Sequence, residues 1–365
     1  MAAVSWENVL ILQTSFLGDT VLTLPLISEV RHRFPVKKLT VLCLPLSREL
    51  LLDHPAIDDI ITDDKKNSDR GWRGLRRTAA RVKEKKFTLA LTPHKSLRSA
   101  LILYLAAIPH RVGFRESRGW FLFHQRAERD PELHDVERNL SVLRPFGLRP
   151  GECRRALDLP VSAATQKFVD EKLRELGILQ NDLMIGISPG SVWETKRWSA
   201  AGFAALIQIL HQKHGCRIAL FGGADDAGVV EDVQRRCDRA AISLVGRIGL
   251  RELPAAINRC RVFITNDSGP MHIAVARRVP TIAIFCATTP RLGFYPYSND
   301  AIVVQRDLSC RPCASHGGRR CPLGTEDCIR QISPNAVLQA VEKLLAGDPS
   351  GESPRLAFQP EFMTV

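Results

Sequence analysis

The stretch that decides the fold reads Thr265-Asn266-Asp267-Ser268-Gly269-Pro270-Met271-His272. A short apolar run at 262–264, typical of a buried strand, precedes it, and small apolar residues typical of a helix follow it. We therefore predict a strand–turn–helix junction, with Asp267 and Ser268 as candidate N-caps and Gly269 where the backbone must come close to another group. The free N–H groups and positive dipole end of such a junction suit a phosphate, to which His272 can add a donor. An ordinary capped helix with a packed histidine is the alternative.

Alternating strands and helices extend from this junction in both directions. In the second half we predict strands at 184–188, 217–221, 242–245, 262–265 and 281–285, with helices at 200–214, 226–237 and 251–258 between them. In the first half we predict strands at 9–12, 39–44, 87–91 and 111–114, with helices at 19–34 and 97–108. A mainly helical connector at 135–146 and 163–176 separates the two series. The chain is therefore predicted to be α/β, with two Rossmann-like, doubly wound domains and an inter-domain cleft.

Length and composition agree with two domains. The chain has 365 residues, and we expect one domain at 1–180, a second at 181–345 and a flexible tail at 346–365, where Gly, Pro and Ser are frequent. No apolar run approaches the ~18–20 residues of a membrane-spanning helix, and no signal segment is recognisable, so we expect a cytoplasmic protein. The formal charge of +12 favours anionic partners, namely nucleic acid, a membrane surface or a phosphorylated substrate.

The first predicted strand is followed by Leu17-Gly18-Asp19. Gly18 permits a tight turn, and Asp19 stands at the start of the next helix, facing the predicted cleft. A carboxylate there can act as a general base, because its reference pKa of about 4 leaves it ionised at neutral pH. A helix N-cap is the alternative role. No G-x-G-x-x-G follows this strand, so the turn is not the dinucleotide-binding fingerprint.

Two loops of the second half offer further groups to a phosphorylated ligand. In the first loop, Gly190 and Ser191 can present backbone and hydroxyl donors, and Lys196 can bring a mobile positive charge to a diphosphate. A solvated Lys-Arg pair is the alternative. In the second loop, Asp225 or Asp226 follows two glycines and can either accept from ribose hydroxyls or cap the next helix.

Together these motifs resemble glycosyltransferase family 9, the ADP-heptose:lipopolysaccharide heptosyltransferases of Gram-negative bacteria. The resemblance rests on Leu17-Gly18-Asp19, Ser188-Pro189-Gly190-Ser191 with Thr195-Lys196-Arg197-Trp198, Gly222-Gly223-Ala224-Asp225, and Asn266-Asp267-Ser268-Gly269-Pro270-Met271-His272. Their order and spacing match over residues 8–345, nearly the whole chain. Ser199 is a minor departure, because many members have proline after the tryptophan.

The resemblance implies a GT-B fold, with the acceptor on the N-terminal domain and the nucleotide sugar on the C-terminal one. It implies an inverting, metal-independent transfer of heptose from ADP-L-glycero-D-manno-heptose to the inner core of lipopolysaccharide. The partners would be the ADP-heptose donor, a phosphorylated lipid A-Kdo acceptor and the anionic inner face of the inner membrane, where the enzyme would be peripheral. No cofactor is implied.

The resemblance also assigns roles to residues of this sequence. Asp19 matches the catalytic base, and Lys196 matches the charge that stabilises the departing ADP. Ile248 falls where the family places an apolar contact to adenine. The full set of donor-binding positions is Gly190, Ser191, Lys196, Asp225, Asp226, Ile248, Asp267, Ser268, Gly269 and His272.

The acceptor side has weaker signals. Beside Gly18, Arg98 and Arg115 follow strands of the first half and are candidates for the phosphates or carboxylates of a lipid acceptor, or else structural residues. The basic stretch 65–86 carries apolar residues three and four apart, at Trp72, Leu75, Ala79 and Val82. Such a helix can lie on an anionic membrane, or it can pack on its own domain with a solvated basic face.

Four cysteines cluster near the C-terminus, at Cys310, Cys313, Cys321 and Cys328. The first pair has the spacing of zinc ligands, whereas the second pair does not. A structural zinc is one interpretation. We favour reduced cysteines that stiffen the loop around Gly317 and Gly318, and we expect no metal.

Two other classes of function are weighed against this one. A GT-B-like transferase or epimerase acting on another nucleotide sugar is the main alternative, but an epimerase needs a second acid or base facing the sugar, which Asp19 alone does not supply. A nucleic-acid binder needs aromatic residues among its basic ones, whereas aromatic residues make up 6% of the chain. We therefore expect no nucleic-acid partner.

Overall fold

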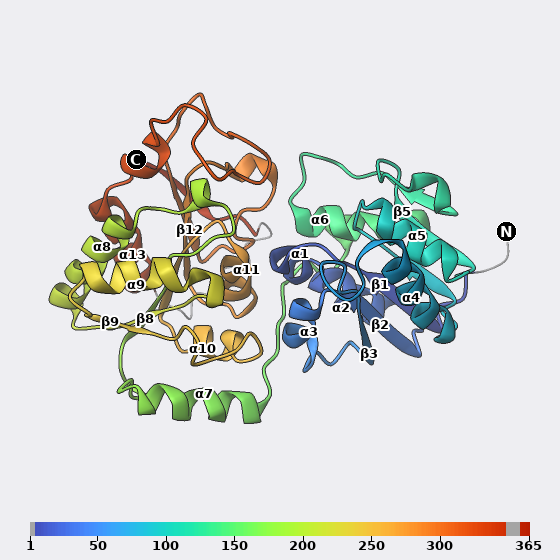
Figure 1. The fold of residues 1–365 in the computed structure, drawn as a ribbon, viewed down its shortest axis with the longest axis horizontal. Helices are drawn as coiled ribbons and strands as arrows, with labels where there is room; N and C mark the ends of the chain where they lie inside the picture. The colour runs from blue at the N-terminus through green and yellow to red at the C-terminus, as the bar shows by residue number, and fades with distance from the viewer. Residues whose placement is uncertain (1–3, 348–357) are drawn as a thin grey trace. The chain divides into compact units, whose positions relative to one another are not determined.

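The computed structural model describes residues 4–347 and 358–365, and the chain divides into two compact units, Met1–Pro160 and Val161–Val365 (Figure 1). Each unit contains one sheet whose strands are all parallel and whose order is that of a doubly wound fold. The division lies at 160 rather than at the predicted 180, because helix α7 (Ala163–Glu175) packs against α10 (Leu253–Asn258) of the second unit.

The first unit is built on a six-stranded sheet of order β3-β2-β1-β4-β5-β6. Its strands are β1 (Asn8–Leu12), β2 (Lys38–Cys43), β3 (Asp59–Thr62), β4 (Leu89–Leu91), β5 (His110–Phe114) and β6 (Gln125–Ala127). The central strands are apolar throughout, since parallel strands are covered on both faces.

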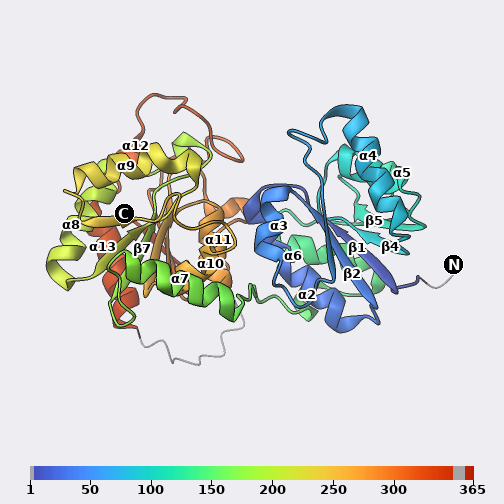
Figure 2. The ribbon, with the colours of Figure 1, turned by 60° about the horizontal axis from the view of Figure 1, so that its bottom comes forward.

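Helices cover both faces of this sheet. They are α1 (Leu17–Leu22), α2 (Leu24–Arg33), α3 (Pro45–Leu51), α4 (Gly71–Glu84), α5 (Leu97–Leu105) and α6 (Asp135–Leu140), with 3-10 turns η1 (Trp120–Leu122), η2 (Ser141–Phe146) and η3 (Pro150–Glu152). Helices α4 and α5 lie side by side (Figure 2), and α6 packs against α1 and α2. The predicted helix at 19–34 is two helices that meet at Thr23, because Pro25 lacks the N–H that a continuous helix requires.

The second unit is built on a seven-stranded sheet of order β13-β12-β11-β10-β7-β8-β9. Its strands are β7 (Met184–Ser188), β8 (Arg217–Leu220), β9 (Ala241–Ser243), β10 (Val262–Asn266), β11 (Thr281–Phe285), β12 (Ala301–Gln305) and β13 (Glu361–Thr364). Helix α13 packs on α8 and on β10, β11 and β12, whereas α11 packs on α10 and on β10 and β11.

The helices of this unit complete the layers. Besides α7 and α10 they are α8 (Ala200–His214), α9 (Ala227–Arg236), α11 (Gly269–Ala276), α12 (Asp327–Arg330) and α13 (Pro334–Ala346), with 3-10 turns η4 (Glu194–Lys196), η5 (Ala224–Asp226) and η6 (Pro290–Leu292). The strand–turn–helix junction predicted around Asp267 is the turn between β10 and α11.

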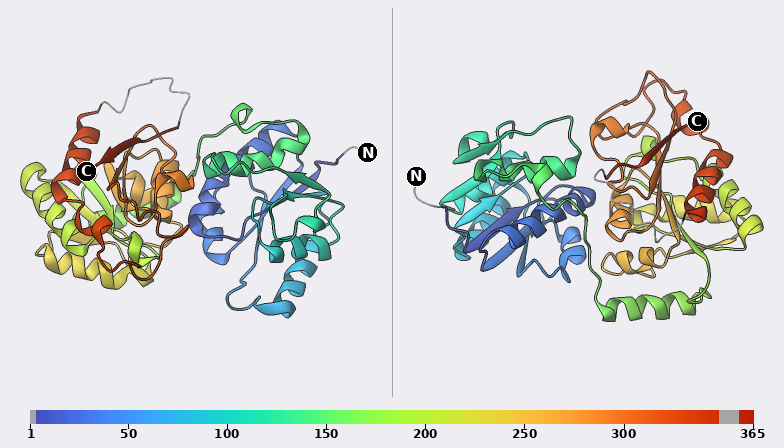
Figure 3. Two further views of the ribbon diagram at one scale, coloured as in Figure 1. Left: turned by 90° about the horizontal axis from the view of Figure 1, so that it is seen from above. Right: turned by 180° about the vertical axis from the view of Figure 1, so that it is seen from behind.

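The flexible tail predicted for 346–365 is corrected at its end. Residues 361–364 form β13, which pairs in parallel with β12 at the edge of the second sheet (Figure 3). Phe358 stacks on Tyr297, and Lys343 forms an ion pair with Glu361, so both side chains and backbone hold this strand. Residues 348–357 lie outside the described part of the chain.

Doubly wound sheets bind ligands where the strand order reverses, beyond the carboxyl ends of the strands. In the first sheet this point lies between β1 and β4, and in the second it lies between β7 and β10. No helix among the described residues is both long enough and apolar enough to cross a membrane.

Candidate active site

Asp19 lies at the switch point of the first sheet, in the first turn of α1. Its Oδ2 accepts a hydrogen bond from the Phe16 N–H at 3.1 Å. Phe16 is the N-cap residue and Asp19 is the third residue of the helix, so Asp19 bonds back to the cap position rather than forming the N-cap itself. Burial raises the pKa of the Asp19 carboxyl to about 7, the Asp135 carboxylate adds to the rise, and a hydrogen bond from Ser15 opposes it. A half-buried carboxyl with a pKa near neutrality can both accept and release a proton.

Polar residues after β3 and β4 adjoin the turn that carries Asp19. The Lys65 ammonium donates to the Thr14 carbonyl oxygen, and the His94 ring meets the Thr14 hydroxyl at 3.2 Å and the Ser99 hydroxyl at 2.8 Å. Burial lowers the pKa of His94 to about 4, with Lys65 contributing, so this ring is neutral at pH 7. Sequence reasoning missed His94 and Lys65, although both follow strands at the carboxyl edge.

The predicted acceptor residues have different surroundings. Arg98 forms an ion pair with the buried Asp63 at 2.6 Å and donates to the carbonyl oxygens of Asp69 and Gly71, so it holds the start of α4 to α5. Arg115 follows β5 and its side chain is exposed. Gly18 lies in the first turn of α1, beside Asp19. An acceptor role for these three residues stays a prediction.

In the second unit, Asn266 at the end of β10 fixes the loop after β7. Its amide donates to the Pro189 carbonyl oxygen at 2.8 Å and to that of Gly190 at 3.4 Å, and its Oδ1 accepts from the Trp198 N–H at 2.9 Å. The side chain is fully buried, so each of these bonds replaces one that water would otherwise make. Asn266 belongs to the motif at 265–272, but the sequence did not predict that its side chain holds the loop after β7.

The loop held by Asn266 carries Lys196, which lies at the switch point of the second sheet. The Lys196 ammonium lies 2.6 Å from Asp267 Oδ2, and the Thr288 hydroxyl donates to the same oxygen at 2.7 Å. Both members of the ion pair are largely buried. The positive charge is therefore held in place before any anion arrives, which lowers the cost of binding one.

The loop that contains the four C-terminal cysteines packs against Lys196 and its neighbour Thr195. The Thr195 hydroxyl and N–H both donate to the Gly318 carbonyl oxygen, and a Cβ on Gly317 would lie 2.8 Å from the Lys196 Cγ. Gly317 also has a φ of +81°, a conformation that favours glycine. The glycines that the sequence marked as a stiffened loop therefore pack on the side chain of Lys196.

The N-terminus of α11 comes just after Asp267, the partner of Lys196, and the side chain at its N-cap position does not cap it. Ser268 stands at the N-cap position before Gly269, but its side chain bonds to Thr265 rather than to a helix N–H. One turn into the helix, His272 is buried, and its Nδ1 has no hydrogen-bond partner among the described residues. Burial lowers the pKa of His272 to about 4, so a neutral ring with one unsatisfied nitrogen is left for a ligand.

The two candidate ribose-binding acids are not equivalent. Asp226 accepts from the Gly223 N–H at 3.0 Å, and a Cβ on Gly190 would lie 2.1 Å from its carboxylate, so Asp226 ties two loops together. Asp225 is exposed in the preceding position. Ser191 is buried, and its carbonyl oxygen accepts from Arg197 at 2.7 Å. Ile248 is half-buried in the loop after β9.

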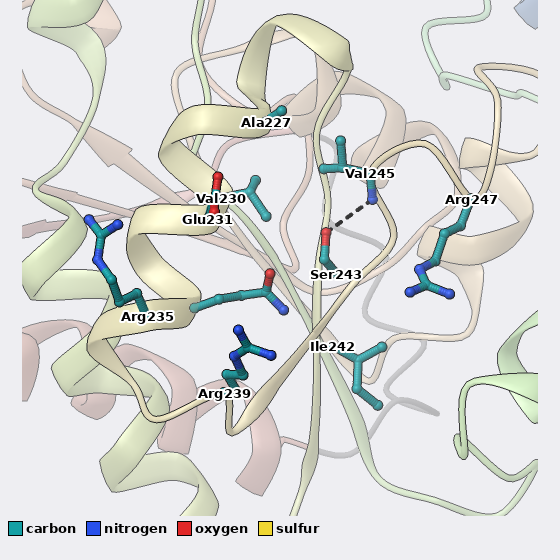
Figure 4. Close-up of a pocket in the computed structure, with 10 residues that line it drawn as sticks. Ala227, Val230, Glu231, Arg235, Arg239, Ile242, Ser243, Val245 and Arg247 are labelled. Atoms are coloured by element: carbon teal, nitrogen blue, oxygen red, sulfur yellow. Dashed lines mark hydrogen bonds between the residues drawn. The ribbon is translucent and has the colours of Figure 1, made fainter.

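A pocket of about 590 Å³ lies between α9 and β9 (Figure 4). Val230, Ile242 and Val245 line it together with Arg239 and Arg247, and the Ser243 hydroxyl accepts from the Val245 N–H at 3.3 Å. Its lining contains none of the predicted donor-binding residues. The residues predicted to bind the donor therefore lie outside this pocket.

The cysteines and the basic helix complete the list of candidates. Among the described residues, no group of three or more His, Cys, Asp or Glu side chains is arranged to hold a metal ion. Cys328 is buried and Cys310 is exposed. In α4, Leu75, Ala79 and Val82 are buried, and the helix packs on α5, so the apolar stripe belongs to the core and only Trp72 stays exposed.

Comparison with known proteins points to one family. The model of glycosyltransferase family 9 (heptosyltransferase) matches residues 75–322. Lipooligosaccharide heptosyltransferase 2 of Haemophilus influenzae is 27% identical over 353 residues, which cover 93% of this chain and 99% of that protein.

Solved structures give the same answer for the fold. The glycosyl transferase family 9 structure from Veillonella parvula has a TM-score of 0.83 at 25% identity and covers 94% of this chain and 98% of its own. The E. coli ADP-heptose lps heptosyltransferase II has a TM-score of 0.76 at 24% identity, and the match covers 93% of this chain and 98% of that one. The predicted GT-B fold of two Rossmann-like domains is confirmed. The family model spans well over half of the sequence, and the chain belongs to glycosyltransferase family 9 (heptosyltransferase).

Proposed function

We propose that this glycosyltransferase moves heptose from ADP-L-glycero-D-manno-heptose to the inner core of lipopolysaccharide. The observation that carries the donor half is the paired Lys196 and Asp267 beside the uncapped N-terminus of α11. A buried cation beside the N-terminus of a helix, where the helix dipole is positive, fits a diphosphate. The names of the relatives give heptose as the sugar and a lipooligosaccharide as the acceptor class, and family membership supports extending these two to this chain. The configuration of the heptose and the inner-core position are part of the proposal.

Asp19 is proposed as the general base. It accepts the proton of an acceptor hydroxyl as that oxygen attacks the anomeric carbon from the face opposite ADP, so the configuration inverts. A carboxyl with a pKa of about 7 supports this role, because it is half-ionised at neutral pH and takes up a proton readily.

The departing ADP gains negative charge on its terminal phosphate. Lys196 and the α11 N–H groups are placed to stabilise that charge, and His272 can donate or accept at the sugar or diphosphate through its unsatisfied Nδ1. We propose that these groups take the place of a metal ion in the transfer. The acceptor is a phosphorylated lipid A-Kdo molecule, and the enzyme acts as a peripheral protein at the cytoplasmic, anionic face of the inner membrane.

The test is release of ADP from ADP-heptose, with Kdo-lipid A and its heptosylated product as alternative acceptors. We expect acceptor-dependent release that EDTA does not change, a product with inverted anomeric configuration by NMR, and one preferred acceptor, which names the core position. If the wild type neither binds nor consumes ADP-heptose, the donor assignment is wrong, and other nucleotide sugars should be screened.

A further inference from the structure

Large apolar side chains are exposed at the carboxyl edge of the first unit's sheet. Trp72 is the second residue of α4, Leu97 is the first of α5, and Trp120 and Phe121 are the first two of η1. Each has between 40% and 59% of its surface exposed. The rings of Trp120 and Phe121 meet edge to face, with centroids 6.0 Å apart. Such rings cost free energy in water, and a contiguous group of them marks a surface that meets another phase or molecule.

Backbone contacts bring these three elements to one place. The Arg98 guanidinium donates to the Gly71 carbonyl oxygen at 3.3 Å, which sets the start of α4 beside the start of α5. A Cβ on Gly119 would lie 3.4 Å from the Leu97 Cδ1, so the chain entering η1 packs directly on the first turn of α5. Phe123, just after η1, is buried, and this fixes the exposed pair above it.

Positive charge surrounds this apolar group. Arg126 places its guanidinium carbon 4.7 Å from the centroid of the Trp120 ring and donates to the Trp120 carbonyl oxygen at 3.1 Å. Exposed cations also stand close to these residues in the chain, with an exposed acid, Glu116, in the same segment as Trp120: they are Arg70, Arg73, Lys95, Arg115 and Arg118. Aromatic rings flanked by arginines match the boundary between acyl chains and anionic head groups.

We propose that Trp72, Leu97, Trp120 and Phe121 form a docking surface for an anionic lipid bilayer. The choice of a bilayer rests on the proposed lipid-linked acceptor together with the charge of the rim. The surface and Asp19 lie at the same edge of one sheet, because each follows the carboxyl end of a parallel strand. Docking through η1 presents an acceptor held in the membrane to the edge that carries the base.

The experiment is co-sedimentation of the full chain with vesicles, in the absence of donor and acceptor. One set contains phosphatidylcholine alone, and the other contains about a third phosphatidylglycerol. The test variant is the double substitution Trp120→Ala and Phe121→Ala. The matched control is Phe168→Ala, an exposed aromatic on α7 with the Lys172 ammonium 5.8 Å from its ring. Melting temperatures establish that both variants fold.

We expect the wild type and the Phe168 variant to bind anionic vesicles, and the double variant to bind them at least about tenfold more weakly. Turnover of a deacylated, water-soluble acceptor should be unchanged in the double variant, whereas turnover of vesicle-bound acceptor should fall. Equal vesicle binding by wild type and double variant, or no vesicle binding by wild type, overturns the proposal. Loss of turnover on the soluble acceptor also overturns it, because the pair would then contact the acceptor itself. Failure of heptose transfer alone leaves the vesicle result standing and refutes only the proposed function.

Discussion

The switch points of the two sheets have the same strand topology, but one carries a lysine in an ion pair and the other a half-buried carboxyl with a raised pKa. In the second unit, Asn266 and Gly318 hold the loop after β7 through hydrogen bonds to Pro189 and Thr195. Thr288 donates to Asp267, the ion-pair partner of Lys196. In the first unit, Asp19 accepts hydrogen bonds from the Phe16 N–H and from Ser15, yet burial and the Asp135 carboxylate still raise its pKa. The site in the second unit is organised by hydrogen bonds among fixed groups, and the site in the first unit by a carboxyl whose ionised form burial disfavours.

The difference follows from what each site is proposed to do. A diphosphate carries fixed charge, so the groups that receive it can be held rigidly in advance at little cost during the reaction. A general base must change its charge during the reaction, and a carboxylate tied into strong bonds would be too weak a base.

The largest expected effect is that of Asp19→Asn. The amide keeps the size of the side chain and can still accept from the Phe16 N–H, but it cannot take up the acceptor's proton. We expect kcat to fall by about a hundred- to ten-thousandfold, with ADP affinity unchanged, measured by steady-state turnover and calorimetry. Glu84→Gln, at an exposed acid of the same unit, serves as the control. A kcat within a few-fold of wild type would show that Asp19 is only a helix cap.

Lys196→Ala should come next. It removes the charge proposed to stabilise the departing ADP, and it leaves the Asp267 carboxylate buried without its cation. We expect kcat to fall by about a hundred- to a thousandfold and ADP binding to weaken as well. Lys213→Ala, which breaks an exposed pair with Glu342 in the same unit, should leave both unchanged. Intact turnover in the Lys196 variant would limit this lysine to a structural partner of Asp267.

Asn266→Ala tests the rigidity of the donor loop. It leaves the Pro189 carbonyl oxygen and the Trp198 N–H buried without this partner. We expect the free energy of unfolding to fall by at least about 2 kcal/mol in urea titrations, and ADP affinity to fall about tenfold. Asn258→Ala, at an exposed asparagine at the end of α10, is the control and should change neither. Weakened stability with full ADP affinity would separate the clamp from binding.

The sequence predicted the second unit better than the first, for physical reasons. Lys196 and Asp267 each stand in a local motif, so the sequence singled out both residues, although it did not predict the ion pair between them. The partners of Asp19 come from other elements: Asp135 lies on α6 and Lys65 follows β3. Short strands such as β3 and β6 were also missed, because three or four residues carry too little periodicity.

The basic helix shows the same limit. Periodicity correctly found the apolar face of α4, but an apolar face packs equally well on a membrane and on α5. Only the tertiary structure decides between them. The exposed surface of Trp72, Leu97, Trp120 and Phe121 could not be predicted as one surface, because its members come from three elements and meet only after folding; of the four, only Trp72 stood in a periodic pattern.

The pH dependence of turnover is expected to be a smaller effect. Because Asp19 must be ionised to accept a proton, kcat/KM should fall about tenfold per pH unit below an apparent pKa of about 7 and level off above it. Asp135→Asn removes the neighbouring negative charge that raises this pKa, so the acidic limb should move to lower pH. An unmoved limb would mean that burial alone sets the pKa of Asp19. A Glu137→Gln variant on the same helix provides the comparison.

Ionisation of Asp19 should raise the activity but lower the free energy of unfolding as the pH increases. The folded-state pKa of about 7 lies above the ~4 of an unfolded aspartate, so the native carboxyl retains its proton between these values. Its stabilising contribution is complete below about pH 4 and is lost as pH rises through 7. Asn cannot ionise, so the melting temperature of Asp19→Asn relative to wild type should rise by a few degrees from pH 4 to 7 and then stay constant. The first unit would then give up stability to keep a usable base, whereas a melting difference independent of pH would show that Asp19 ionises as easily in the folded chain as in the unfolded one.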